Sequence, residues 1–174
     1  MAVTIAKADF KDYPYVEPNH LSAPRDGRVY AQLPADESIT VLTNGQFVKY
    51  DYAAGKVDFT GKGPWMMVFN EEKLYDERKQ SHADFAMTKE NSLHGVMVPR
   101  VFGMVAGDVF TTNNLADGEY SVGDMVTPAA SNGILAKSDS SITPAAGTLV
   151  CQVVKETTMP DGKRKAVKLQ VLSA

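Results

Sequence analysis

The sequence has little cysteine, no long apolar run and no excess of positive charge. Only one of its 174 residues is a cysteine, Cys151, so the chain cannot form an intramolecular disulfide. Cys151 alternates with Leu149 and Val153 in a strand pattern. We therefore interpret it as a small buried hydrophobic residue rather than a reactive thiol.

Segments that would direct the chain to a membrane or to nucleic acid are also missing. No apolar run reaches transmembrane length, and the first residues lack the apolar core of a secretory signal. The formal net charge is −3 and the pI is about 5.6, whereas nucleic-acid-binding proteins normally present a basic face. The one basic cluster, Lys163 to Lys165, falls at a predicted hairpin turn, where charges usually solvate the turn. We expect no membrane or nucleic-acid partner, and a chain that stays in the cytoplasm or in an assembly formed there.

Motifs for catalysis or metal binding are absent from the sequence. His20, His82 and His94 are far apart, and none has a second ligand at metal-binding spacing. There is no Gly-x-Ser-x-Gly elbow and no phosphate-binding glycine loop. Asp108 and Asp124 could form an acid–base pair, but each follows a glycine before a strand, where aspartates commonly bond to their own backbone. We predict no enzymatic activity, no cofactor and no bound metal.

What the sequence does contain is a series of turn and strand patterns. With 44% hydrophobic and 22% charged residues it has ordinary globular composition. Residues 107–112 are echoed by 123–128, and both segments place Gly-Asp directly before a β-type run. Residues 148–157 and 165–172 are β-rich runs joined by Met159-Pro160-Asp161-Gly162, which predicts a C-terminal hairpin.

An earlier segment carries the strongest local hairpin pattern. Asn44-Gly45 separates two β-type runs, residues 38–43 and 46–52, and this dipeptide supplies the positive φ angles of a two-residue turn. We therefore predict a hairpin over 38–52. Further strands are expected over 57–60 and 65–69.

One helix is predicted. Asn70 can cap it, Glu71 and Glu72 suit its first turn, and helical spacing continues into the eighties. Because the segment is highly charged, the helix should lie on the surface. After it, Pro99 cannot donate a ladder hydrogen bond, which places it at a sheet edge or a bulge.

The N-terminal part of the chain suggests an extended arm. Between residues 12 and 34 the sequence has four prolines, which block helix, yet it keeps apolar and aromatic residues. Such a segment lies on a surface, either its own domain's or a neighbour's. The candidate partner-binding residues are Tyr13, Tyr15, Val16, Leu21 and Tyr30.

Several of these segments together resemble the auxiliary capsid proteins of tailed bacteriophages, which decorate or cement the head or form a head-fiber base. The resemblance rests on residues 65–77, 84–86, 99–102 and 107–113 and would extend over about Trp65 to Leu172. It implies a small β-barrel with an extended arm, located on the capsid exterior of a virion and bound to the major capsid protein. It also implies a trimer, and the apolar arm and an exposed β edge at Pro99 favour a homo-oligomer.

The sequence therefore predicts a mainly β (α+β) fold. We expect a small antiparallel β-barrel or sandwich built from hairpins, with one surface helix and an extended N-terminal arm. The predicted division is an arm over 1–32, a β-hairpin lobe with the helix over 33–95, and a β-barrel-like domain over 96–174. The predicted function is a structural virion protein on a phage capsid.

Two alternative functions belong to other classes. A carbohydrate-binding β module would use Trp65 and surface tyrosines as stacking platforms, although the apolar strand around Trp65 favours its burial. A small hydrolase is the weakest alternative, because no triad or metal spacing supports it.

Overall fold

The computed structural model describes residues 2–6, 16–70, 86–138, 142–160 and 162–174. Within these ranges the protein is mainly β, with four antiparallel sheets and one short 3-10 helix, η2 (Leu93–Gly95). This confirms the mainly β, antiparallel prediction. No α-helix occurs in the described ranges, and the helix predicted from Glu71 into the eighties falls outside them.

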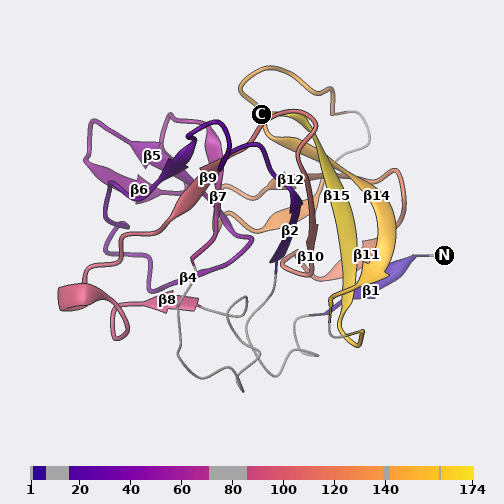
Figure 1. Ribbon diagram of the computed structural model, residues 1–174, viewed down its shortest axis with the longest axis horizontal. Helices are drawn as coiled ribbons and strands as arrows, with labels where there is room; N and C mark the ends of the chain where they lie inside the picture. The colour runs from indigo at the N-terminus through magenta and orange to yellow at the C-terminus, as the bar shows by residue number, and fades with distance from the viewer. Residues whose placement is uncertain (1, 7–15, 71–85, 139–141, 161) are drawn as a thin grey trace.

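The largest sheet has six strands in the order β13-β12-β14-β15-β10-β2 (Figure 1). Its strands are β2 (Val16–His20), β10 (Val109–Thr112), β12 (Met125–Pro128), β13 (Leu135–Lys137), β14 (Val150–Thr158) and β15 (Lys165–Ser173). The predicted barrel does not form in the described part of the chain, because the two edge strands do not pair. β2 carries Pro18, which has no N–H to donate, and β13 is bridged by Leu115.

The C-terminal hairpin prediction is confirmed. β14 pairs antiparallel with β15 along its length, with register shifts near Cys151 and Val154. The Met159 N–H donates to the Arg164 carbonyl at 2.8 Å, which closes the turn. In Figure 1 this hairpin runs along the side of the molecule as two long twisted strands.

The two Gly-Asp segments begin strands in the same way, as predicted. Gly107 donates to the Val171 carbonyl and Gly123 to the Val153 carbonyl, each at 2.8 Å. The carbonyls of Asp108 and Asp124 then accept the N–H groups of those same valines, at 2.9 Å each. The same pair of backbone hydrogen bonds therefore joins the start of β10 to β15 and the start of β12 to β14.

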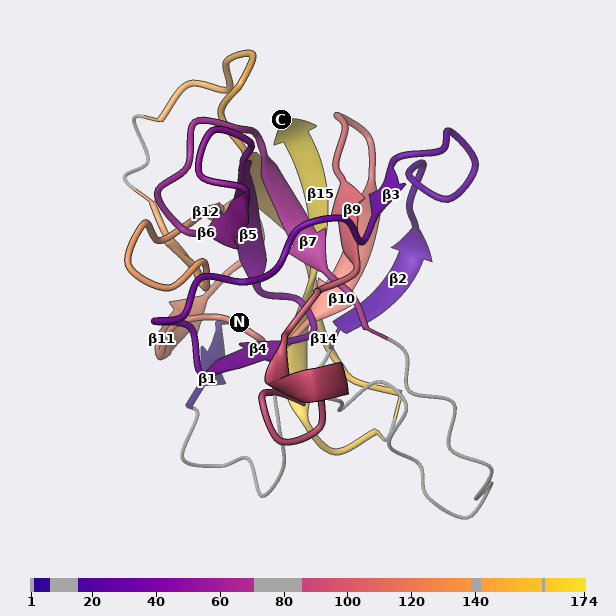
Figure 2. The ribbon, with the colours of Figure 1, turned by 90° about the vertical axis from the view of Figure 1, so that its left-hand side faces the viewer.

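A second sheet has five strands in the order β3-β9-β7-β5-β6. In Figure 2 it lies in front of the six-stranded sheet. Its edge strand β6 is bridged by Ala35, so the edge is covered by the chain itself. The strands are β3 (Val29–Tyr30), β5 (Phe47–Asp51), β6 (Lys56–Asp58), β7 (Trp65–Val68) and β9 (Val101–Gly103).

Two small sheets complete the described fold. β1 (Val3–Ile5) pairs with β11 (Gly118–Tyr120), and β4 (Val41–Thr43) pairs with β8 (Ala86–Thr88). The pairing of β4 with β8 means that the hairpin predicted over 38–52 is wrong.

The turn at Asn44-Gly45 exists, but it does not join paired strands. Gln46 donates to the Thr43 carbonyl at 3.2 Å, and Gly45 has φ 82°. β5 cannot pair with β4 because β6 and β7 already occupy both of its edges. The Asn44 side chain is instead buried, where it donates to the Asn70 carbonyl at 3.0 Å and accepts the Asn70 N–H at 2.7 Å.

Two hydrophobic clusters lie on opposite faces of the five-stranded sheet. One face contributes Phe47, Met67 and Phe102 to the larger cluster, together with inward residues of the six-stranded sheet such as Phe110 and Leu169. The other face contributes residues to a second cluster with Ile39, Leu42 and Met97; these are Val48, Tyr50, Met66, Val68 and Val101. Burial on both faces explains the continuous apolar run at 65–69.

The sheets interleave the three predicted segments of the chain. β1 and β2, from the predicted arm, pair with β11 and β10 of the C-terminal segment. β9, from that same segment, pairs with β7 in the five-stranded sheet. The divisions at residues 32 and 95 therefore do not coincide with boundaries between sheets.

Candidate interaction surfaces

The described residues of the predicted arm pack on their own chain. Val16 is fully buried in the larger cluster, and Leu21 is half-buried against it. Tyr30 is half-buried in β3, opposite Val101 of β9. Tyr13 and Tyr15 lie outside the described residues. Contact of Leu21 or Tyr30 with a partner stays a prediction, whereas Val16 has no surface to offer one in this fold.

Three tyrosines form a row that ends at the surface. Tyr50 is buried and packs edge-on against Tyr30 and Tyr52, with ring centroids 6.2 Å and 5.7 Å apart. Burial raises the pKa of Tyr50, whose hydroxyl accepts the Gln32 N–H at 3.2 Å. Tyr52 is 71% exposed, so its ring is available to a ligand.

Trp65 is half-buried against the larger cluster. The Lys49 ammonium lies over its ring, 4.7 Å from the centroid. This cation–π contact occupies a ring face that a sugar would need for stacking.

Pro99 does not form an exposed edge. It lies in an irregular segment before β9 and is buried. On either side of it, Met97 accepts the Ala35 N–H and Arg100 accepts the Phe69 N–H through their carbonyls, at 2.7 Å and 3.0 Å. The exposed edge predicted at Pro99 is therefore wrong, because the backbone on either side of Pro99 already bonds within the chain.

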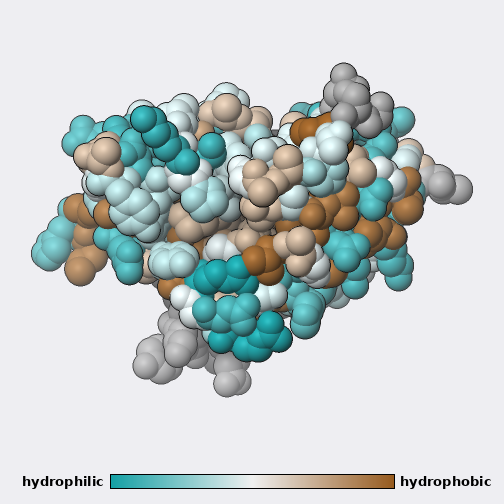
Figure 3. Space-filling model, turned by 90° about the horizontal axis from the view of Figure 1, so that it is seen from above, coloured by the Kyte–Doolittle hydropathy of each residue, from teal (hydrophilic) through white to brown (hydrophobic). Residues whose placement is uncertain are grey.

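Exposed aliphatic side chains lie at the end of the molecule formed by β4, β8 and the segment after η2. Leu93 is 80% exposed, Val96 49%, Val41 39% and Val98 37%. Figure 3 shows a group of hydrophobic atoms at one end of the molecule, the end at which η2 lies in Figure 1. This apolar end was not predicted from the sequence, because Val96, Met97 and Val98 form a continuous apolar run that does not indicate which side chains face outward.

Asp108 and Asp124 both bond to nearby backbone, as the turn interpretation predicts. Asp108 accepts the Val105 N–H at 3.0 Å and the Ser22 hydroxyl at 2.7 Å. Asp124 accepts the Ser121 N–H at 2.8 Å and pairs with Lys137 at 2.7 Å. Their carboxylates thus stabilise the turns that begin β10 and β12.

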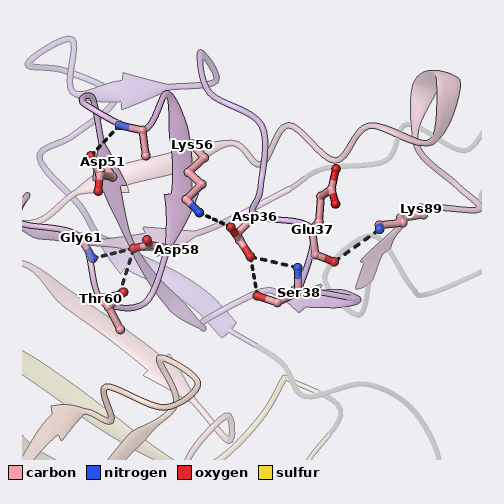
Figure 4. Close-up of polar contacts among 10 residues, drawn as sticks. Asp36, Glu37, Ser38, Asp51, Lys56, Asp58, Thr60, Gly61 and Lys89 are labelled. Carbon is pink, nitrogen blue, oxygen red and sulfur yellow. Dashed lines mark hydrogen bonds and ion pairs between the residues drawn. The ribbon is translucent and has the colours of Figure 1, made fainter.

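Another set of carboxylates surrounds β5 and β6 (Figure 4). Asp58 accepts the Thr60 and Gly61 N–H groups at 2.9 Å and 2.6 Å, and Asp51 accepts the Ala54 N–H at 2.9 Å. Asp36 pairs with Lys56. Each of these carboxylates either accepts hydrogen bonds within a turn or forms an ion pair next to β5 and β6.

The remaining candidate ligands and nucleophiles do not come together in the described part of the chain. His20 ends β2 and His94 lies in η2, while His82 is outside the described residues. No group of three His, Cys, Asp or Glu side chains among the described residues could hold a metal ion. Cys151 is fully buried, which confirms the buried interpretation, and this burial raises the pKa of its thiol well above its ordinary value.

Comparison with protein-family models, curated proteins and solved structures finds no match to this chain. Among the described residues, no helix has the length and apolar character needed to cross a membrane.

Proposed function

We propose that the chain is a structural virion protein that binds the outside of a phage capsid and reinforces or decorates it. The capsid as the partner comes from the resemblance of residues 65–77, 84–86, 99–102 and 107–113 to auxiliary capsid proteins. The observation that carries the proposal is the apolar end formed by Val41, Leu93, Val96 and Val98.

These side chains are exposed although the fold already buries two large hydrophobic clusters. Exposed aliphatic groups that gather at one place mark protein interaction sites more often than single scattered ones do. A protein surface is therefore the occupant that we propose, and the major capsid protein is the partner that the resemblance implies.

Attachment without catalysis suits such a role. Several shallow contacts with a repetitive particle combine into high avidity, and a homo-oligomer, proposed as a trimer, multiplies them. We propose a sandwich form for the fold, in which the two larger sheets share one core. The proposal includes no enzymatic activity and no cofactor.

The test uses particles of a phage whose genome encodes this sequence. Mass spectrometry should find the chain in purified virions, and cryo-electron images of particles with and without it should differ on the outer surface. Leu93→Asp with Val96→Asp should reduce rebinding to particles that lack the chain at least tenfold, because carboxylates disfavour an apolar contact. Val122→Asp is the matched control. Val122 is also an exposed aliphatic residue, at 61%, but it lies between β11 and β12 and not at the apolar end. Absence of the chain from virions would refute the proposal.

A carbohydrate-binding function remains the second candidate, and Tyr52 is the observation that favours it. Its 71% exposed ring could stack on a sugar. Trp65 is less suitable, because Lys49 covers its ring. Glycan-array binding that is lost in Tyr52→Ala, together with no virion association, would favour this alternative.

A further inference from the structure

Two lysines face each other on neighbouring strands of the six-stranded sheet. Lys155 on β14 is the register partner of Lys168 on β15. Directly opposed side chains of antiparallel strands have Cβ atoms about 5 Å apart, and like charges in that position destabilise the pair. Lys155 is exposed and Lys168 is half-buried.

No acidic residue in the described part of the chain is a register partner of either lysine. No ion pair joins either ammonium to another described residue. Thr111 is the next residue in the row on β10, and the first acidic residue, Glu17, lies beyond it on β2. Where a sequence breaks a local rule without an internal gain, the position often serves function.

The charge of this hairpin differs from that of the whole protein. Residues 154–168 contain five basic and two acidic side chains, a balance of +3, whereas the whole chain has −3. The rest of the chain therefore has a net charge of −6. The hairpin therefore carries a net positive charge in a chain whose other residues are acidic overall.

We infer that the Lys155–Lys168 face of the β14–β15 hairpin binds a carboxylate-rich protein surface. This inference rests on the proposed function, since the acidic surface would belong to the capsid, and it identifies a second contact besides the apolar end. A carboxylate placed between the two ammonium groups would remove their repulsion, so the free protein holds a site that its partner completes.

A protein partner is favoured over nucleic acid. Residues 150–173 contain no Phe, Tyr or Trp, so the hairpin has no platform for stacking bases. Half-buried Gln152, Gln170 and Val109 occupy the neighbouring row of the sheet. Such a mixture of amide and aliphatic groups suits a protein interface.

The decisive variant is Lys168→Glu in the full chain. It creates an opposite-charge pair with Lys155, so the melting temperature should stay the same or rise. Binding to an anionic partner should nevertheless fall about tenfold or more at low salt, with the difference narrowing between about 50 mM and about 300 mM NaCl. Lys62→Glu is the control, because it makes the same charge change on an exposed residue in the loop between β6 and β7.

Two probes separate the possible outcomes. Binding of wild type, Lys168→Glu and Lys62→Glu is measured to poly-L-glutamate and to a DNA duplex, and attachment is measured to phage particles that lack the chain. Weaker binding of Lys168→Glu alone, to both poly-L-glutamate and particles, supports the inference. Equal losses in both variants overturn it, and tighter binding of wild type to DNA than to poly-L-glutamate overturns the choice of a protein partner.

The particle measurement also distinguishes this inference from the proposed function. If wild type and Lys168→Glu attach equally well to particles, the hairpin is not a capsid contact, while the proposed function stands. If wild type does not attach but poly-L-glutamate binding still depends on Lys168, the acidic-surface site stands and the proposed function fails.

Discussion

Gly45 and Gly162 lie in two turns with similar backbones but different surroundings. Their φ angles are 82° and 68°. A Cβ added at Gly45 would meet Val16 Cβ at 3.0 Å and Thr112 Oγ1 at 3.2 Å, whereas nothing lies within 4 Å at Gly162. The exposed turn closes a hairpin, and the buried turn connects strands of different sheets. A turn sequence thus predicts that the chain changes direction but not which strands pair.

The largest effect is expected where β5 leaves the buried turn. Gly133 accepts the Phe47 N–H at 2.8 Å, and a Cβ there would lie 1.7 Å from the Phe47 carbonyl oxygen. Gly133→Ala should therefore lower the free energy of unfolding by more than about 4 kcal/mol, measured by urea denaturation. Gly147→Ala is the control, because Gly147 also has positive φ but no neighbour within 4 Å. Similar losses in both variants would contradict the steric argument.

The next effect concerns the amide that holds the buried turn. Asn44→Ala leaves the buried N–H and carbonyl of Asn70 without that partner, which should lower stability by about 2–4 kcal/mol. Asn91 makes the same kind of bridge at the surface, accepting from Thr88 and donating to Ala86. Because water can replace an exposed bridge, Asn91→Ala should lower stability by about 1 kcal/mol or less. If thermal and urea unfolding give the reverse order, burial does not decide the strength of these bridges.

A direct substitution in each turn sharpens the comparison. Gly162→Ala should lose about 1 kcal/mol from backbone strain alone. Gly45→Ala should lose about 2–3 kcal/mol, because contact with Val16 adds to the same strain. Equal losses of unfolding free energy in the two variants would mean that Val16 and Thr112 can move away from the added methyl group without a loss of stability.

The smallest effect is expected at an exposed turn. Hydrogen bonds from Lys56 and, to a smaller extent, from Ser38 hold the pKa of the Asp36 carboxyl below its usual range. A lowered carboxyl pKa contributes stability that is complete above the unfolded value of about 3.9 and is lost as the pH falls through the folded value. Asp36→Asn should therefore melt with a shallower dependence on pH than wild type below about pH 4. Glu119→Gln, at an exposed position of β11, is the control, and an unchanged slope in Asp36→Asn would contradict the linkage.

The predictable parts of the fold are those fixed by local chemistry. The C-terminal hairpin and the strand starts after Gly107-Asp108 and Gly123-Asp124 could be predicted because turn and strands are contiguous. Burial of Cys151 followed from alternation with its neighbours.

The parts that could not be predicted depend on contacts between distant residues. The pairing of β4 with β8 and of β2 with β10 joins segments far apart in the chain, which no local pattern encodes. The lysine pair and the apolar end also could not be predicted from local patterns. Counting back from the predicted turn at 159–162 would have placed Lys155 opposite Ala166, because the observed turn extends to Arg164 and shifts the register to Lys168. The exposure of Leu93 depends on where the core ends.

The central position of β15 has a consequence for how the protein folds. β15 lies between β14 and β10, and β10 in turn holds β2, so a strand near residue 170 must join one near residue 110 and, through it, one near residue 18. Closing such large loops lowers the chain entropy before any stabilising contact forms, so chains with many distant pairings fold slowly. We therefore expect the denatured chain to refold slowly, over about milliseconds to seconds, as domains dominated by distant strand pairings do.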